Sequence, residues 1–166
     1  MGEALEPLIG EYFHSLDSKL RLTLPAKLRA AIDAKAEGAG FYVVQEFDGC
    51  LSLYPPQRYR ETHPVPDAAA TVTQGQKNCR RVHFGTTDYV ELDRMGRLII
   101  SQSSLNRCEI KKDVTIVGVQ DHIEVWDRTK WETFVLAEMR RQREKAEREL
   151  KAEEQGPGTP PAVNQG

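Results

Sequence analysis

The sequence repeats itself, and this internal duplication constrains the fold more than any other feature. Residues 12–24 (YFHSLDSKLRLTL) and 88–100 (DYVELDRMGRLII) share Leu-Asp and Arg-Leu at a constant offset. Residues 43–59 and 115–131 then match in the same order, with aliphatic and aromatic positions coinciding. One short match could be chance, but two ordered blocks indicate a duplicated unit. Each copy is small for an independent core, so we expect the two copies to share one.

Each copy has the same predicted order of elements. An extended segment leads into Leu-Asp-x-x-x-Arg, where polar residues predict a hairpin turn before a second extended segment. A short helix follows, expected at 26–34 in the first copy and around 103–108 in the second. Two further strands are expected on either side of Asp48-Gly49 in one copy and of Gln120-Asp121 in the other. The predicted unit is therefore β-β-α-β-β, present twice.

The segments outside the copies are polar or helical. Trp131, Phe134, Val135 and Met139 fall on one stripe at helical spacing, and charged residues four apart, such as Glu144 and Arg148, favour a solvated helix beyond them. The expected organisation is an N-terminal tail (1–9), repeat 1 (10–59), a linker with a short basic helix (60–86), repeat 2 (87–131), a C-terminal helix (132–154) and a disordered tail (155–166).

Composition narrows the class of protein. The net charge is −2, so any contact with nucleic acid must come from a local basic patch. The apolar runs are far shorter than the about 20 residues of a membrane-spanning helix, and the N-terminus lacks the basic region of a signal peptide. Three widely spaced cysteines argue against a disulfide framework. We therefore expect a cytoplasmic protein with no membrane association.

The repeated Asp-x-x-x-Arg motif is the sharpest candidate for a functional site. Across a tight turn this spacing places Asp17 near Arg21, and Asp93 near Arg97. The aspartate could bond backbone N–H groups of the turn or orient the arginine, whose planar fork of donors suits phosphate oxygens or the edge of guanine. The residues alone leave a second interpretation open, in which each ion pair only stabilises its hairpin.

Several segments of the sequence resemble a known protein family. Segments 10–29 (GEYFHSLDSKLRLTLPAKLR) and 89–105 (YVELDRMGRLIISQSSL) resemble the two duplicated signatures of MraZ proteins. The blocks at 50–59, 117–131 and 79–82 (CRRV) resemble the family's later strands and inter-repeat helix. The likeness runs from about Gly10 to Phe134. It implies a mixed α+β, β-rich fold in which two SpoVT/AbrB-like halves form a pseudo-symmetric swapped-hairpin (double-ψ-like) barrel, followed by a C-terminal helix.

The resemblance also implies a function. It indicates a nucleoid-associated transcriptional regulator that assembles into homo-oligomeric rings. Its partner would be double-stranded DNA carrying short direct repeats upstream of the bacterial division and cell-wall gene cluster. Transferred by position, the DNA-contacting residues are Asp17, Lys19, Arg21, Asp93, Arg94 and Arg97. Arg94 is carried over only as a basic residue in the turn, not as an identity.

Three positions depart from the family pattern. Leu20 stands where a turn glycine is usual, so we expect a distorted first hairpin or an apolar tip. Ser101 replaces a usual proline and Leu105 arrives one residue late, which predicts a shifted second helix. The departure at Leu20 motivates an alternative function, a ring-forming protein-interaction module that has lost DNA binding.

An enzymatic function has little support in the sequence. No phosphate-binding loop or catalytic signature is present, and His14, His63, His83 and His122 lack metal-ligand spacing. We expect no cofactor, no metal and no small-molecule substrate. Cys50 and Cys108 are expected to be buried as small apolar residues. The pairs Tyr54/Trp126 and Tyr59/Trp131 are expected to close the core, since duplex recognition leaves the bases stacked.

Overall fold

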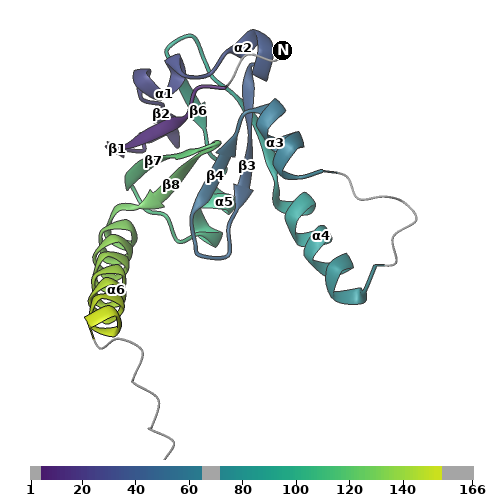
Figure 1. Cartoon of the computed structure of the whole chain (residues 1–166). Helices are drawn as coiled ribbons and strands as arrows, with labels where there is room; N and C mark the ends of the chain where they lie inside the picture. Colours follow the sequence, from purple (N-terminus) through teal and green to yellow (C-terminus); the bar gives the residue numbers. More distant parts are fainter. Residues whose placement is uncertain (1–4, 65–71, 155–166) are drawn as a thin grey trace, which may run out of the picture. The chain divides into compact units, whose positions relative to one another are not determined.

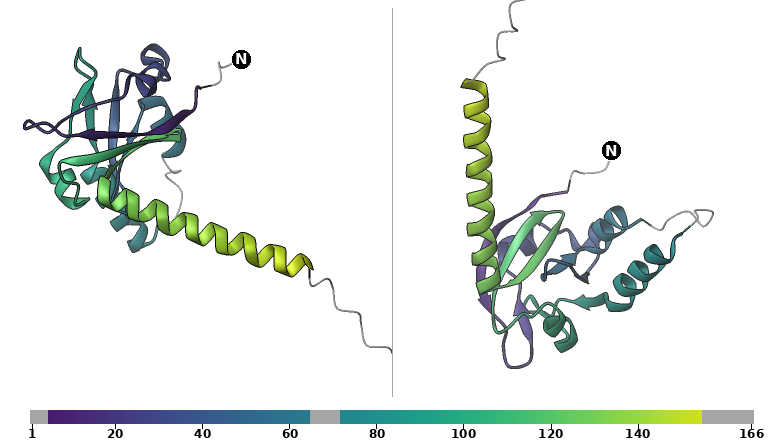
Figure 2. Two further views of the ribbon diagram at one scale, coloured as in Figure 1. Left: turned by 90° about the vertical axis from the view of Figure 1, so that its left-hand side faces the viewer. Right: turned by 90° about the horizontal axis from the view of Figure 1, so that it is seen from below.

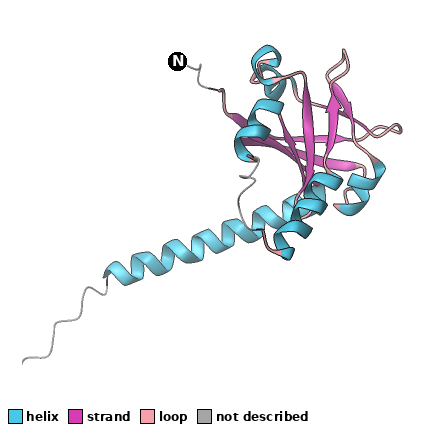
Figure 3. Ribbon diagram, turned by 90° about the vertical axis from the view of Figure 1, so that its right-hand side faces the viewer, coloured by secondary structure: helices cyan, strands magenta, loops and turns pink. Residues whose placement is uncertain are grey.

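The computed structural model describes residues 5–64 and 72–154, which belong to two compact units divided between Arg128 and Thr129. The first unit is a mixed α+β fold, as predicted, and the second is helical. In Figure 3 the strands of the first unit are magenta and the long C-terminal helix is a single cyan element. The predicted disordered tail at 155–166 lies outside the described residues.

The elements follow the predicted β-β-α-β-β order in each copy. The first copy contains β1 (Leu8–Ser15), β2 (Arg21–Thr23), α1 (Ala26–Ala30), α2 (Ala34–Glu37), β3 (Gly40–Gln45), β4 (Leu51–Tyr54) and then α3 (Pro56–Thr62). After α4 (Gln74–Thr86), the second copy contains β5 (Asp88–Glu91), β6 (Arg97–Ile99), α5 (Gln102–Arg107), β7 (Asp113–Gln120) and β8 (His122–Asp127), and α6 (Arg128–Glu154) ends the described chain. Figure 1 labels these elements.

The two copies exchange strands. The first strand of copy one, β1, pairs antiparallel with β7 of copy two along its whole length, and β5 of copy two pairs with β3 of copy one. The strands β2 and β6 pair only with each other and form a separate two-stranded ribbon. In the larger sheet, the first strand of each copy therefore pairs with a strand of the other copy (Figures 1 and 2).

The larger sheet is open. Its six strands run in the order β1-β7-β8-β4-β3-β5, so among the described strands β1 and β5 are its two edges. The closed barrel implied by the resemblance is not found, and the swapped-hairpin barrel stays an expectation. The domain boundaries drawn from the sequence likewise stay predictions.

One apolar core lies between the sheet and the ribbon. Leu22 and Leu98 sit opposite each other in the ribbon and are almost completely buried. They join residues of the central strands, such as Leu53 and Ile123, in a single cluster drawn from both copies. Each fully buried side chain of this kind contributes roughly 1.5–3 kcal/mol to the free energy of unfolding. This shared core confirms that the copies fold together.

Several helices differ from their predicted bounds. The helix predicted at 26–34 ends at Ala30, because Asp33 begins a second helix, α2, by accepting a hydrogen bond from Lys35 N at 2.9 Å. The linker helix is longer than expected, since Thr73 and Gln76 cap the start of α4 reciprocally. The last helix begins at Arg128 instead of 132.

The C-terminal helix α6 is mostly solvated, as its composition predicts. Glu144 and Arg148 form the expected pair at 3.7 Å. Glu138 and Arg141 form a shorter one at 2.5 Å. None of the helices in the described ranges is both long and apolar enough to cross a membrane.

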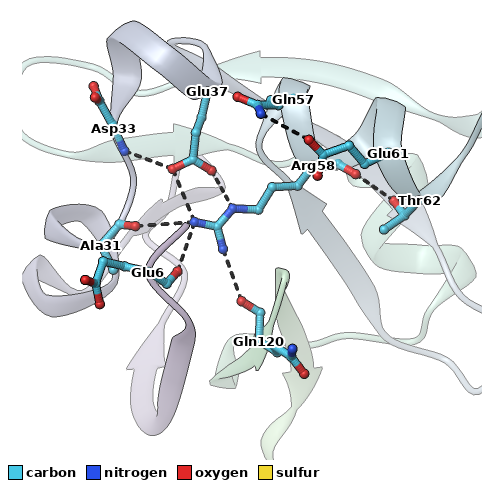
Figure 4. Close-up of polar contacts among 9 residues, drawn as sticks. All are labelled: Glu6, Ala31, Asp33, Glu37, Gln57, Arg58, Glu61, Thr62 and Gln120. Carbon is cyan, nitrogen blue, oxygen red and sulfur yellow. Dashed lines mark hydrogen bonds and ion pairs between the residues drawn. The ribbon is translucent and has the colours of Figure 1, made fainter. Parts of the chain in front are cut away.

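A buried arginine ties the two copies together. Arg58 on α3 and Glu37 on α2 form an ion pair in which both side chains are only 2% exposed. The Arg58 Nη1 donates to the Gln120 carbonyl at 3.1 Å in the β7–β8 turn, and Nη2 donates to the Glu6 carbonyl at 3.0 Å (Figure 4). Nη2 also reaches the Ala31 carbonyl at 3.4 Å. One guanidinium on α3 therefore contacts the N-terminal segment, the residue that ends α1, the helix α2 and the second copy.

Candidate nucleic-acid interface

The two Asp-x-x-x-Arg turns have the same hydrogen-bond pattern. In the first, Asp17 Oδ1 accepts from the backbone N–H of Lys19 at 2.8 Å and of Arg21 at 2.9 Å. In the second, Asp93 Oδ1 accepts from Met95 N at 2.8 Å and Arg97 N at 3.0 Å. Because each carboxylate satisfies two N–H groups of its own turn, it fixes the turn conformation.

The other oxygen of each carboxylate holds the arginine. Arg21 Nε donates to Asp17 Oδ2 at 2.6 Å, and Arg97 Nε donates to Asp93 Oδ2 at 2.8 Å. These contacts lower the pKa of Asp17 to about 2, mainly through the backbone N–H of Arg21, and lower the pKa of Asp93 through that of Arg97. Both aspartates are therefore ionised at neutral pH. The aspartate both bonds the backbone and orients the arginine, two roles that the spacing had offered as alternatives.

The ribbon brings the two arginines onto one face. Arg21 lies opposite Ile99, and Thr23 lies opposite Arg97, with the buried Leu22/Leu98 pair between them. Since side chains alternate across a strand, both arginines point to the face opposite the buried leucines. Their positions are diagonal across the ribbon. Each has its Nε occupied by aspartate, and in the described part of the chain no other group accepts from either guanidinium.

The turns lie at opposite ends of this ribbon and project from the folded body, the first in purple and the second in teal (Figure 2, left). Lys19 and Arg94 are exposed in them, one at each end, so the structure does not bring these two together. Each turn carries one aspartate and two cations, which leaves each with a net positive charge. The candidate surface is thus locally basic on a chain of net charge −2.

The expected distortion at Leu20 is wrong. Leu20 adopts φ 58°, close to the 74° of Gly96 in the second turn, and its N–H bonds the Asp17 carbonyl at 3.0 Å as the N–H of Gly96 bonds that of Asp93 at 2.9 Å. Its side chain packs against the core instead of forming an apolar tip. The core contact compensates a backbone conformation that disfavours side chains. In the second Asp-x-x-x-Arg turn the apolar Met95 is 68% exposed.

The expected shift of the second helix is not found at its start, and only the buried leucine is displaced along it. Ser101 caps α5 by accepting from Ser104 N at 3.2 Å, so it replaces proline with a side-chain cap. Both α1 and α5 begin directly after the residue at the proline position. Leu28 and Leu105 are both buried although Leu105 comes one residue later along its helix.

A hollow of about 410 Å³ lies beside the first turn. It is bounded by Asp17, Leu20, α5 and the α5–β7 connection. Lys111 and Lys112 line it and are exposed. The first hairpin therefore has two lysines on its flank, next to a surface depression.

Arg29 lies against the second turn, although it belongs to neither Asp-x-x-x-Arg motif. This residue of α1 donates from Nε to the Leu24 carbonyl at 3.1 Å. Its guanidinium lies over the second turn, because a Cβ added to Gly96 would come within 2.6 Å of the Arg29 Cζ. Arg29 belongs to the first copy, and only the strand exchange places it against the second copy's turn. Its position could not be inferred from spacing.

The remaining candidate groups lie in the core or far from the ribbon. Cys50 and Cys108 are buried, as expected. Tyr54 and Trp126 are buried as predicted, and Tyr54 stacks on His122 with ring centroids 4.6 Å apart. In the described ranges no three His, Cys, Asp or Glu side chains are grouped to hold a metal ion.

The regions of this chain that match known proteins include both turns. The family model "MraZ protein" matches residues 8–64 and 83–152. The transcriptional regulator MraZ of Finegoldia magna is 36% identical over 126 residues, which cover 76% of this chain and 85% of the relative. The protein of the same name from Clostridium beijerinckii is 36% identical over 129 residues, with the same two shares of 76% and 85%. That of Pediococcus pentosaceus is 34% identical over 130 residues, again covering 76% and 85%.

Proposed function

The chain belongs to the MraZ family, and on this premise we propose that it is a transcriptional regulator that binds double-stranded DNA through the face of the β2–β6 ribbon. The observation that supports this site is the pair of matched turns, each with a guanidinium held by a carboxylate. The proposed contact residues are Asp17, Lys19, Arg21, Asp93, Arg94 and Arg97. Within this set the arginines and Lys19 make the direct contacts, and the aspartates position them.

Physical chemistry supports this division of roles. Arg21 and Arg97 each use Nε for the aspartate, which leaves their terminal nitrogens to bond phosphate oxygens or the O6/N7 edge of guanine. Because the aspartate fixes each side chain in advance, less conformational entropy is lost on binding. Lys19 and Arg94 are exposed point charges suited to the DNA backbone.

We further propose that recognition is multivalent. One subunit offers few cations, so a single site should bind weakly. A ring of subunits would engage several direct repeats at once, which raises apparent affinity by roughly 10² to 10⁴ without new contacts. The repeats would lie upstream of the division and cell-wall genes, and the protein would act on the nucleoid in the cytoplasm. The exchange of strands between the copies supports our proposal that a swapped-hairpin barrel presents the two Asp-x-x-x-Arg turns.

The first test is a gel-shift titration of the full chain on its own upstream DNA. The Arg21→Ala/Arg97→Ala variant should lose about 1–3 kcal/mol of binding free energy per arginine. The matched control, Arg60→Ala/Arg143→Ala, removes two exposed arginines from α3 and α6 and should bind like the wild type. Wild-type affinity should fall steeply with salt. Salt-insensitive binding, or equal binding by both variants, would contradict the proposal.

Repeat number tests the multivalent part separately. A probe with three repeats should bind far more tightly than a probe with one, and the footprint length should grow with repeat number. Equal affinity for the two probes would refute multivalency while leaving DNA binding intact.

The alternative, a protein-interaction ring without DNA binding, loses its motivation. It rested on a first turn damaged by Leu20, yet Leu20 keeps the hydrogen bonds and the positive φ of the glycine-containing turn. Nothing in the geometry of the turn disables the first hairpin.

A further inference from the structure

We propose that Arg29 is a further DNA-contacting residue, which binds a backbone phosphate beside the second hairpin and makes the two hairpins unequal. This inference rests on the proposed DNA-binding function. It adds a residue outside both Asp-x-x-x-Arg motifs, contributed by the first copy to the second copy's hairpin.

The charge balance of the ribbon is the first argument. The ion pairs neutralise Arg21 and Arg97 to a large degree, since each lies within 2.6–2.8 Å of its aspartate. Among the described residues, no carboxylate pairs with Arg29, whose one hydrogen-bond acceptor is the neutral Leu24 carbonyl. Arg29 is therefore, beside Arg94 of the turn itself, a second guanidinium at this turn with no carboxylate partner among the described residues.

Its fixed position is the second argument. The Nε bond to Leu24 anchors the side chain at the point where β2 leaves the ribbon, and Leu24 N in turn donates to the Gly96 carbonyl at 2.9 Å. A Cβ at position 96 would come within 2.6 Å of the guanidinium and displace it. Arg29 is partly exposed there, so its Nη groups remain available next to the turn. A fixed, partly desolvated cation binds an anion better than a freely moving surface lysine.

The asymmetry of the turns is the third argument. Leu20 in the first turn occupies the position that Gly96 occupies in the second, and no arginine lines the hollow beside Leu20. The flank of the first turn instead carries Lys111 and Lys112 around this hollow. A guanidinium held by a backbone hydrogen bond therefore lies at the second hairpin, whereas two exposed lysines lie beside the first.

The test compares Arg29→Gln with Arg29→Lys by salt-dependent titration on a one-repeat duplex. Arg29→Gln should weaken binding about tenfold, the loss of one charge-assisted hydrogen bond, and should reduce the slope of log K against log salt by about 1. Arg29→Lys keeps the charge and should retain the wild-type slope. Arg60→Ala on α3 removes one charge elsewhere and should change neither quantity.

The outcomes separate this inference from the proposed function. If Arg29→Gln lowers the melting temperature but keeps the affinity and the salt slope, Arg29 only fastens α1 to the turn and the inference is overturned. If Arg29→Gln behaves like wild type while Arg21→Ala/Arg97→Ala loses binding, the inference fails and the DNA site stands. If the wild type shows no salt-dependent DNA binding, the proposed function itself fails.

Discussion

At the scale of single residues, the two aspartates have a defined place in the proposed DNA-binding surface. A carboxylate next to DNA repels phosphate, yet Asp17 and Asp93 direct both oxygens into their own turns. Their negative charge therefore interacts with N–H groups of the protein itself. We expect their contribution to binding to be indirect, through the conformation of the turn and the orientation of Arg21 and Arg97.

The lowered pKa of Asp17 predicts how the first turn responds to acid. A carboxyl group whose pKa is lower in the folded state stabilises the fold above its unfolded pKa, and this stabilisation is lost as the pH falls through the folded value. For Asp17 these values are 3.8 and about 2. NMR spectra recorded from pH 6 to 2 should show the amides of Lys19 and Arg21 unchanged above about pH 3 and about half shifted near pH 2. A midpoint near 3.8 would contradict the hydrogen bonding described.

Sequence reasoning was strongest for these residues. The four-residue spacing across a turn was enough to predict contact between Asp17 and Arg21, because the partners are local. It misjudged Leu20, because the usual preference of glycine for positive φ says nothing of a core that compensates the strain. It missed Arg29, because the contact with Gly96 depends on how the two copies interleave.

At the scale of elements, the hairpins and short strands were predictable from alternation and turn residues, and the helices less so. The break between α1 and α2 depends on one capping residue, Asp33, in a stretch whose alanines favour a continuous helix. The pairing of β2 with β6 could not be derived from periodicity, since a three-residue strand carries no information about its partner.

We predict opposite effects on stability for two glycine substitutions, one in the second turn and one in α4. Gly96→Ala should cost roughly 1–2 kcal/mol of stability, because Gly96 has φ 74°, and should also displace Arg29. Gly85→Ala in α4 should stabilise by about 0.5–1 kcal/mol, because a Cβ there meets nothing within 4 Å and alanine favours a helix. Urea unfolding would measure both. Equal effects of the two substitutions would show that neither the backbone nor Arg29 constrains the second turn.

At the scale of the whole molecule, the fold depends on one buried ion pair as well as on the core. In sequence, Arg58 and Glu37 are indistinguishable from the many surface charges of this chain. Their burial follows from the convergence of α2, α3, the N-terminal segment and the β7–β8 turn, which only the three-dimensional arrangement brings together.

Breaking this pair should be one of the most damaging single changes. Arg58→Met leaves the Glu37 carboxylate buried without its cation and should cost about 3–5 kcal/mol of unfolding free energy. The double variant Arg58→Met/Glu37→Leu removes both charges and should recover much of that loss. Arg60→Ala, two residues along and exposed, is the control and should stay within about 0.5 kcal/mol of wild type. A loss below about 1 kcal/mol for Arg58→Met would show that water reaches the site.

The exchange of hairpins has a consequence for the history of such a chain. A polypeptide with a single copy would leave its own β1-type strand unpaired and its sheet one strand short, so it could finish folding only against a second polypeptide. Duplication turns that encounter between two molecules into a step within one. It also lets the halves diverge, as Leu20 and Gly96 have done, because one gene now encodes both sides of what a homodimer would have to keep identical.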